Sequence, residues 1–150
     1  MRVFELVSEL VLPRRPSELF PFFSDAHNLE RITPPWLRFR VLTPGPIVIA
    51  PGTRIDYRLH WHGIPMRWRS EIAAWDPPHR FVDRQIRGPY RLWEHEHVLA
   101  EADGGTTVKD HVRYAVLGGR AVHTLLVRRD VAAIFAYRRR VLSQIFGSGT

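Results

Sequence analysis

Three residues in the segment 88–97 carry side chains that could do chemistry, and they recur at every second position. Successive side chains of a strand point to opposite faces, so Trp93, His95 and His97 share one face. Leu99 continues that face with an apolar side chain, which indicates that the face points into the protein. The sequence therefore predicts an indole and two imidazoles, buried or half-buried, along one inward strand face.

The stretches on either side add further polar groups to this pattern. After the histidines, one carboxylate and one phenol alternate with valines at Val108, Asp110, Val112 and Tyr114. Before them, a carboxylate and an amide follow an aromatic residue at Phe81, Asp83 and Gln85. Buried polar groups need hydrogen-bond partners, so we expect these side chains to contact one another or a bound molecule.

Such a set of residues supports two kinds of function. His95 or His97, tuned by Asp83 or Asp110, could move protons on a polyketide-like or aromatic substrate, and we take His95, His97 and Asp110 as the candidate catalytic residues. The same groups could instead orient a ligand in a binding pocket. The chain has no Ser-His-Asp order, glycine-rich phosphate loop or HExxH helix, so binding is the interpretation that we favour.

A metal site is the third alternative for the histidines. Two histidines at this spacing can ligate zinc when a carboxylate such as Asp110 joins them. Same-face residues of a strand lie about 6.5 to 7 Å apart, however, which is wide for two ligands of one ion. We therefore expect core or pocket-lining histidines, with no metal and no other cofactor.

Aromatic side chains form a second inward-facing set. Tyr57, Leu59 and Trp61 alternate on one expected strand, and Trp68 lies on the next. Each alone is explained by an ordinary core, but together they suit a flat or ring-shaped ligand, because aromatic side chains give a large contact area at little entropic cost. We expect the ligand to contact Tyr57, Leu59, Trp61, Trp68, Phe81, Asp83, Gln85, Trp93, His95, His97, Asp110, Tyr114, Ile134 and Tyr137.

Length and composition exclude several classes of protein. The 150 residues correspond to one domain, expected to span residues 1–150. The absence of cysteine excludes disulfides, thiolate metal sites and cysteine nucleophiles. No apolar stretch approaches the ~20 residues that cross a bilayer, and no signal-like pattern begins the chain, so we expect a soluble, cytoplasmic protein.

The net charge of +7 would suit a nucleic-acid or anionic-membrane partner. Arginines are scattered at solvent-facing strand positions such as Arg54, Arg84 and Arg113, whereas a nucleic-acid binder would cluster them with exposed aromatics. We therefore expect no nucleic-acid partner. The densest basic run, Arg138 to Arg140 with Arg128 and Arg129, is either an anionic-lipid contact or the solvent face of an amphipathic helix. We favour the solvent face, which would still allow a weak membrane-surface contact.

Hydrophobic patterning predicts the elements that position these residues. A strand over 2–12 is followed by a short helix from Pro16, a second that ends at Ile32, and a strand over 37–42. The loop 43–52 has an apolar middle that could cover a cavity. A meander of antiparallel strands follows at 53–61, 64–75, 80–86, 90–100 and 106–116. Apolar residues then recur at helical spacing and predict one long amphipathic helix to about Phe146.

This order of elements comes with a set of motifs: Asn28-Leu29, Thr33-Pro34, Gly52, Trp75-Asp76-Pro77-Pro78, Phe81-Val82-Asp83, Gly88-Pro89-Tyr90, Trp93-x-His95-x-His97, Gly105-Thr106, Asp110, Tyr114 and Ile134-Phe135-x-Tyr137-Arg138. Together they resemble the Bet v 1-like or START-like superfamily, also called SRPBCC. More closely, they resemble its bacterial ligand-binding members, which are grouped with polyketide cyclase/dehydratase-like domains. The resemblance implies an α+β helix-grip fold, in which a seven-stranded antiparallel sheet bends around a long C-terminal helix. It implies no catalytic residues, because the superfamily shares none.

We therefore expect the chain to bind a hydrophobic small molecule of lipid, polyketide or aromatic type in a cavity between the sheet and the C-terminal helix. The first alternative is a polyketide cyclase/dehydratase-like enzyme that uses the pocket histidines and aspartate. The second is a lipid carrier or adaptor that docks through its basic helix. Nothing in the sequence specifies an oligomeric state.

Overall fold

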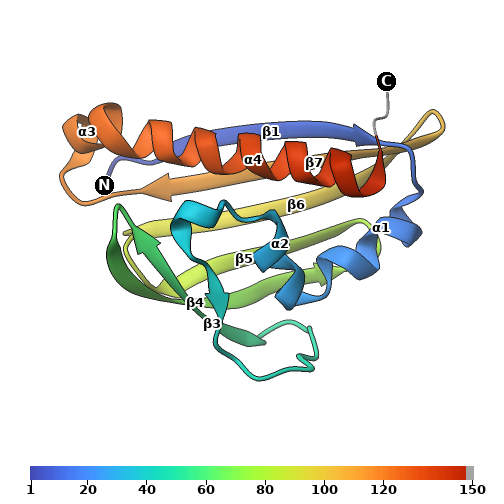
Figure 1. Cartoon of the computed structure of the whole chain (residues 1–150), viewed down its shortest axis with the longest axis horizontal. Helices are drawn as coiled ribbons and strands as arrows, with labels where there is room; N and C mark the ends of the chain where they lie inside the picture. The colour runs from blue at the N-terminus through green and yellow to red at the C-terminus, as the bar shows by residue number, and fades with distance from the viewer. Residues whose placement is uncertain (148–150) are drawn as a thin grey trace.

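Within residues 1–147, the part of the chain that the computed structural model describes, one antiparallel sheet contains seven strands in the order β1-β7-β6-β5-β4-β3-β2 (Figure 1). Their bounds are β1 (Phe4–Leu12), β2 (Arg40–Val41), β3 (Arg54–Trp61), β4 (Ile64–Asp76), β5 (Arg80–Arg87), β6 (Leu92–Ala102) and β7 (Gly105–Ala115). From β3 to β7 each strand pairs with the next along the chain. The first strand returns to pair with the last, so β1 forms one edge of the sheet.

Short helices follow β1, and a long helical segment ends the described chain. The helices are α1 (Pro16–Phe23), η1 (Ala26–Asn28), α2 (Leu29–Ile32), η2 (Pro35–Leu37), α3 (Gly119–Val122), the π-helical η3 (His123–Val127) and α4 (Arg128–Phe146). Pro16 begins α1, where a missing N–H costs nothing. Asp25 starts the next turn, because its carboxylate accepts a hydrogen bond from the backbone N–H of His27.

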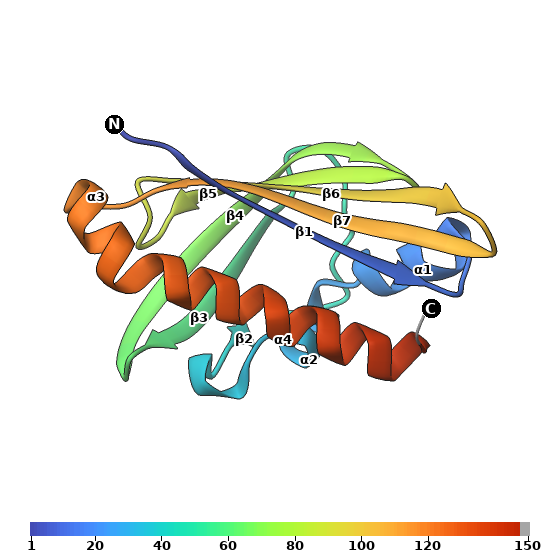
Figure 2. The ribbon, with the colours of Figure 1, turned by 90° about the horizontal axis from the view of Figure 1, so that it is seen from above.

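The sheet bends around α4, which runs along its inner face while β3 and β4 curve past it (Figure 2). Register shifts in β4, between Arg69 and Ser70 and between Ile72 and Ala74, are irregularities of the kind that bend a strand. The β3–β4 hairpin closes in two residues, His62 and Gly63, both at positive φ, as the twist of paired strands favours.

Three apolar clusters lie between the sheet and the helices. One lies between α1 and the end of α4, around Leu12, Leu19, Leu99 and Leu142. A second packs the start of α4 on β6 and β7, around Trp93, Val112, Val131 and Phe135. A third joins Ala26, Ile55 and Tyr57, with Ile47 and Ile49 of the loop 43–52 packed against it. The apolar middle of that loop thus covers the inner side of β3.

The fold class predicted from the sequence is confirmed: the α+β arrangement is a seven-stranded antiparallel sheet with short helices after the first strand and a long helix at the end. The strand predicted over 37–42 is shorter, Arg40–Val41, because the preceding prolines start a 3-10 turn and Arg38 takes a left-handed conformation. The predicted long helix contains one π-helical turn. No helix among residues 1–147 is long and apolar enough to cross a membrane.

Candidate functional site

The inward face of β6 carries the histidines, as the alternation predicts. Trp93, His95, His97 and Leu99 are 8%, 5%, 3% and 0% exposed. This strand lies between β5 and β7 in the sheet, so the histidines have a neighbouring strand on each side. Those two strands supply the partners of the imidazoles.

Each histidine is hydrogen-bonded to a carboxylate on a different neighbouring strand. His95 Nε2 lies 2.8 Å from Asp110 Oδ1 on β7, and His97 Nε2 lies 2.7 Å from Asp83 Oδ2 on β5. Both bonds are diagonal, because the register places Asp110 opposite His97 and Asp83 opposite His95. The two histidines therefore connect three strands through side chains as well as through the backbone.

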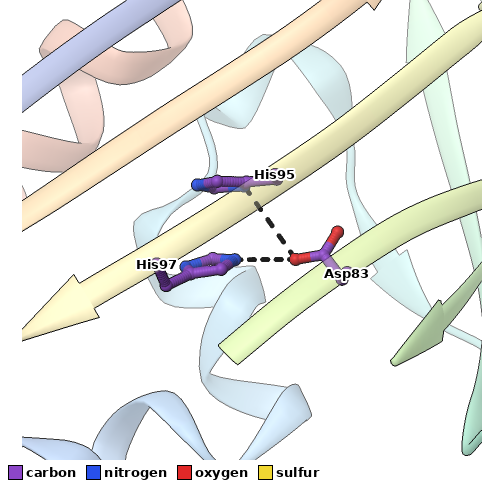
Figure 3. A group of neighbouring side chains, drawn as sticks. All are labelled: Asp83, His95 and His97. Carbon is purple, nitrogen blue, oxygen red and sulfur yellow. Dashed lines mark hydrogen bonds and ion pairs between the residues drawn. The ribbon is translucent and has the colours of Figure 1, made fainter. Parts of the chain in front are cut away.

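The imidazole rings are much closer together than the spacing of their backbone positions. The ring centroids of His95 and His97 are 3.6 Å apart, with 23° between the planes. The ring of Phe81 stacks on that of His97, with the centroids 3.9 Å apart and 11° between the planes. Figure 3 shows the two imidazoles one above the other on β6, each with one nitrogen facing the carboxylate of Asp83. The reason for discounting a metal, a ligand separation of about 6.5 to 7 Å, does not hold for the rings.

Arg138 of α4 completes this group, which we name the β6 polar cluster: Asp83, His95, His97, Asp110 and Arg138. The guanidinium Nη2 lies 3.3 Å from Asp110 Oδ1 and 3.3 Å from His97 Nδ1. Arg138 is only 6% exposed. The interpretation of the run from Arg138 to Arg140 as a solvent face is therefore wrong for Arg138.

The rest of that basic run lies outside the cluster. Arg139 is half-buried and donates from Nη1 to Ser8 Oγ at 2.6 Å, which ties α4 to β1. Arg140 is exposed, and its guanidinium lies 5.2 Å from the ring centroid of Tyr137. Of the three consecutive arginines, only Arg140 is exposed, as the sequence predicts.

The contacts of His97 assign its proton. A guanidinium can only donate, so His97 Nδ1 accepts from Arg138, and the Nε2–H of His97 donates to Asp83. Burial and the nearby His95 lower the pKa of His97 to about 4, against the opposing effect of Asp83. His97 is therefore neutral at pH 7.

The two carboxylates of the β6 polar cluster are ionised. Burial alone would raise the pKa of Asp110, but the charge of Arg138 and the hydrogen bond to His95 outweigh it and hold that pKa below its usual range. Burial likewise opposes ionisation of Asp83, and the hydrogen bond from His97 with the nearby charges lowers its pKa. Two carboxylates against the one guanidinium of Arg138 leave these three side chains with one net negative charge.

A cavity of about 370 Å³ lies between the sheet and α4, and most of the residues predicted as ligand contacts line it. They are Tyr57, Leu59, Trp61, Trp68, Phe81, Asp83, Trp93, His95, His97 and Ile134. The lining is otherwise largely apolar and comes from the short helices, the loop 43–52, β3, β4 and the segment before α4. Asp83, His95, His97 and Arg138 of the β6 polar cluster line it as well.

The remaining predicted contacts do not line this cavity. Asp110 is 3% exposed, and the histidines and Arg138 use its carboxylate instead. Gln85 closes the turn before β6 by exchanging hydrogen bonds with the backbone of Tyr90. The hydroxyl of Tyr114 shares a 2.7 Å hydrogen bond with His123 Nε2. Tyr137 packs edge-on against the exposed Trp36, also outside the cavity lining.

Sequence reasoning missed Arg138, although the helical pattern contained a signal for it. Val131, Phe135 and Leu142 are buried on α4, and Arg138 falls between them at the spacing of four, three and four that defines one helix face. It also missed Asp130, whose carboxylate accepts a 2.7 Å hydrogen bond from Trp61 Nε1 across the cavity wall. No spacing rule connects those two, because they are distant in sequence.

Comparison with known proteins places the chain by sequence and by fold. Residues 12–133 match the family described as polyketide cyclase / dehydrase and lipid transport. No curated protein matches the chain in sequence. The fold recurs in many solved structures, among them protein CV1439 from Chromobacterium violaceum, with a TM-score of 0.75 and 13% identity over 95% of this chain and 96% of that one.

Two further structures extend the range of relatives. Major latex-like protein 151 from Panax ginseng has a TM-score of 0.71 and 12% identity, over 96% of this chain and 97% of that one. Protein Ms6760 from Mycobacterium smegmatis has a TM-score of 0.67 and 19% identity, over 93% of this chain and 90% of that one. At such identities the likeness shows a shared Bet v 1-like helix-grip fold, and the ligand has to be inferred from the site itself.

Proposed function

Because the chain belongs to the polyketide cyclase / dehydrase and lipid transport family, we propose that it binds a hydrophobic small molecule of lipid, polyketide or aromatic type in the cavity between the sheet and α4. The observation that carries this proposal is the cavity itself. Its volume of about 370 Å³ falls within the range of roughly 300 to 1,000 Å³ typical of small-molecule sites. Its lining is mostly apolar and aromatic, with few polar groups.

The polar groups of the lining would set the orientation of the ligand. Asp83, His95, His97 and Arg138 lie in one part of the wall, whereas Tyr57, Trp68 and Ile134 supply apolar surface. A few placed polar groups in an apolar pocket fix which end of a ligand faces which wall. A ligand with a polar or ring-bearing end and an apolar body therefore suits this cavity best.

Native mass spectrometry of the purified protein, followed by denaturing extraction, tests the proposal directly. A co-purifying lipid or aromatic compound would name the chemical class of the ligand. For quantitative binding, the neutral fluorescent probe N-phenyl-1-naphthylamine can be titrated and its emission followed.

A matched pair of α4 variants makes the titration specific to the cavity. Ile134 lines the cavity, and the neighbouring Ala133 is exposed. We expect Ile134→Trp to weaken probe binding at least tenfold, about 1.4 kcal/mol, because the larger side chain fills part of the cavity. Ala133→Trp should leave it unchanged. Equal affinities in both variants, or an absence of saturable binding by the parent protein, would contradict the proposal.

A second function, proton-transfer catalysis on the bound molecule, is favoured by the geometry of His95. Its Nε2–H donates to the buried carboxylate of Asp110, while its Nδ1 lies 4.0 Å from Asp83, beyond hydrogen-bond distance. A carboxylate that holds one imidazole nitrogen while the other faces a cavity is an arrangement used in general-base catalysis. His97 is less suited to this role, because both of its nitrogens are engaged.

Turnover of polyketide-type substrates by the parent protein and by His95→Gln distinguishes catalysis from binding alone. An enzyme should lose most of its rate in His95→Gln while N-phenyl-1-naphthylamine still binds. A rate unaffected by that substitution would exclude His95 as the base, and no turnover of any substrate that binds would leave binding as the function.

A further inference from the structure

We propose that Asp83, His95 and His97 form a binding site for a divalent first-row transition metal ion, open on one side to the cavity. One carboxylate oxygen and two imidazole nitrogens from these residues lie within 4.8 Å of one another. The donor set of two histidines and one carboxylate suits ions such as Zn²⁺, Co²⁺ or Fe²⁺. This site goes beyond the proposed ligand binding and does not depend on it.

The three donor atoms converge from two strands. Asp83 Oδ2 on β5 lies 2.7 Å from His97 Nε2 and 4.0 Å from His95 Nδ1, both on β6 (Figure 3). Ligands of a tetrahedral ion with bonds of about 2.0 to 2.1 Å lie about 3.3 Å apart. The observed separations of 2.7 and 4.0 Å lie on either side of that value, so the side chains must rearrange within the cluster to bind an ion.

Asp110 lies where a second carboxylate would orient both imidazoles. Its Oδ1 is 2.8 Å from His95 Nε2 and 3.5 Å from His97 Nδ1, the nitrogens on the far side of each ring from Asp83. Histidines that bind metals usually donate their other N–H to a carboxylate or carbonyl, which fixes the tautomer and the ring orientation. With an ion bound, the proton of His97 would move from Nε2 to Nδ1 and face Asp110. Arg138 would then lose its hydrogen bond to His97 Nδ1 and keep its contact with Asp110.

The charge of the surroundings also favours a cation. Asp83 and Asp110 carry two negative charges against the single positive charge of Arg138, whose guanidinium stays 3.3 Å from Asp110. Asp83, His95 and His97 all line the cavity, whereas Asp110 does not. The remaining coordination positions of the ion would therefore face the cavity, as in metal sites that bind a small molecule.

The stacking of the rings defines what must change when the ion binds. The ring centroids of His95 and His97 are 3.6 Å apart, with 23° between the ring planes, whereas a metal ion lies near the plane of each imidazole that binds it. Each ring must therefore turn toward Asp83, and the ring contact of His97 with Phe81 at 3.9 Å must loosen. Binding should thus be visible in the signals of the two imidazoles as well as in metal content.

Equilibrium dialysis of tag-free protein, stripped with a chelator and then exposed to Zn²⁺, tests the site. We expect one equivalent to bind with a dissociation constant at or below about 10 µM, close to −7 kcal/mol. Asp83→Asn keeps the size of the side chain but removes its charge, and should weaken binding tenfold or more. His111→Gln is the matched control, because His111 lies half-buried on β7 and contacts Glu5 rather than the cluster.

Further readouts keep the test independent of folding. Circular dichroism establishes that each variant is folded, and NMR of the histidine side chains should show that Zn²⁺ shifts the His95 and His97 signals and leaves His111 unchanged. Zn²⁺ binding weaker than about 10 µM, a loss below tenfold in folded Asp83→Asn, or an equal loss in His111→Gln would overturn the proposal.

Discussion

Two buried polar groups lie on the same inner face of the sheet, and they differ in charge and in access to the cavity. The β6 polar cluster joins two carboxylates, two imidazoles and one guanidinium. The second group is a neutral pair, Tyr114 and His123, joined by one 2.7 Å hydrogen bond and covered by Phe4, which stacks on His123 at 3.4 Å. His95 and His97 line the cavity, whereas Tyr114 and His123 do not.

The difference teaches which buried polar groups point to function. Tyr114 and His123 are hydrogen-bonded to each other and lie outside the cavity lining, so the neutral pair adds stability and order but is not placed to contact a ligand. The β6 polar cluster retains a net charge, presents His95 Nδ1 and Asp83 toward the cavity, and leaves the buried Arg138 Nε without a partner among the described residues. Both groups are buried, so charge and access to the cavity are what distinguish them.

The largest effect is expected from removing the positive charge of the β6 polar cluster. Arg138→Met keeps an extended side chain but leaves Asp110 buried without its guanidinium. Breaking a buried ion pair from one side costs about 3 to 5 kcal/mol, so the free energy of unfolding should fall by that much in denaturant titrations. The exposed Arg140→Met on the same helix should change it by less than about 0.5 kcal/mol. Similar losses in both variants would mean that helix propensity or surface charge, rather than the ion pair, is responsible.

The burial of Arg138 also indicates how much of the site can be predicted from the sequence. The strands and the inward direction of His95, His97 and Asp110 follow from alternation with a period of two, which depends only on backbone geometry. The position of Arg138 on the buried face of α4 was equally available from helical spacing, but its charge favoured the surface interpretation. Where a buried residue of opposite charge such as Asp110 lies opposite, helical spacing predicts the burial of a side chain better than its residue type does.

Other features could not be predicted from local patterns. The diagonal pairing of His95 with Asp110 and of His97 with Asp83 depends on how far each ring is rotated, which the neighbouring Phe81 and Arg138 decide. Tyr114 matches the inward pattern as well as Asp110 does, yet its hydroxyl is hydrogen-bonded to His123 on the π-helical turn that follows β7. Alternation predicts the direction of a side chain, whereas its partner is set by tertiary packing.

A smaller effect is expected in the neutral pair. Tyr114→Phe removes the hydroxyl and leaves His123 Nε2 buried without a partner, which should cost about 1 to 3 kcal/mol of unfolding free energy. Replacing both residues by phenylalanine removes donor and acceptor together and should be close to neutral, because the stacking on Phe4 can persist. If the double variant lost as much unfolding free energy as Tyr114→Phe and His123→Phe lose together, the two side chains would not be energetically coupled.

The smallest expected effect is the contribution of the neutral pair to the pH dependence of the unfolding free energy. Burial and the charges of Arg128 and Arg2 lower the pKa of His123 below 6.5, so the unfolded chain binds this proton more readily than the folded one. His123 therefore favours unfolding progressively as the pH falls below 6.5, and its effect levels off once the pH is below the pKa of the folded state. The double variant Tyr114→Phe/His123→Phe lacks this group, so its unfolding free energy should rise relative to the parent protein as the pH is lowered from 7 to 5. Because both proteins contain the same β6 polar cluster, their difference isolates His123, and a difference that stays constant with pH would mean that the neutral pair does not titrate in this range.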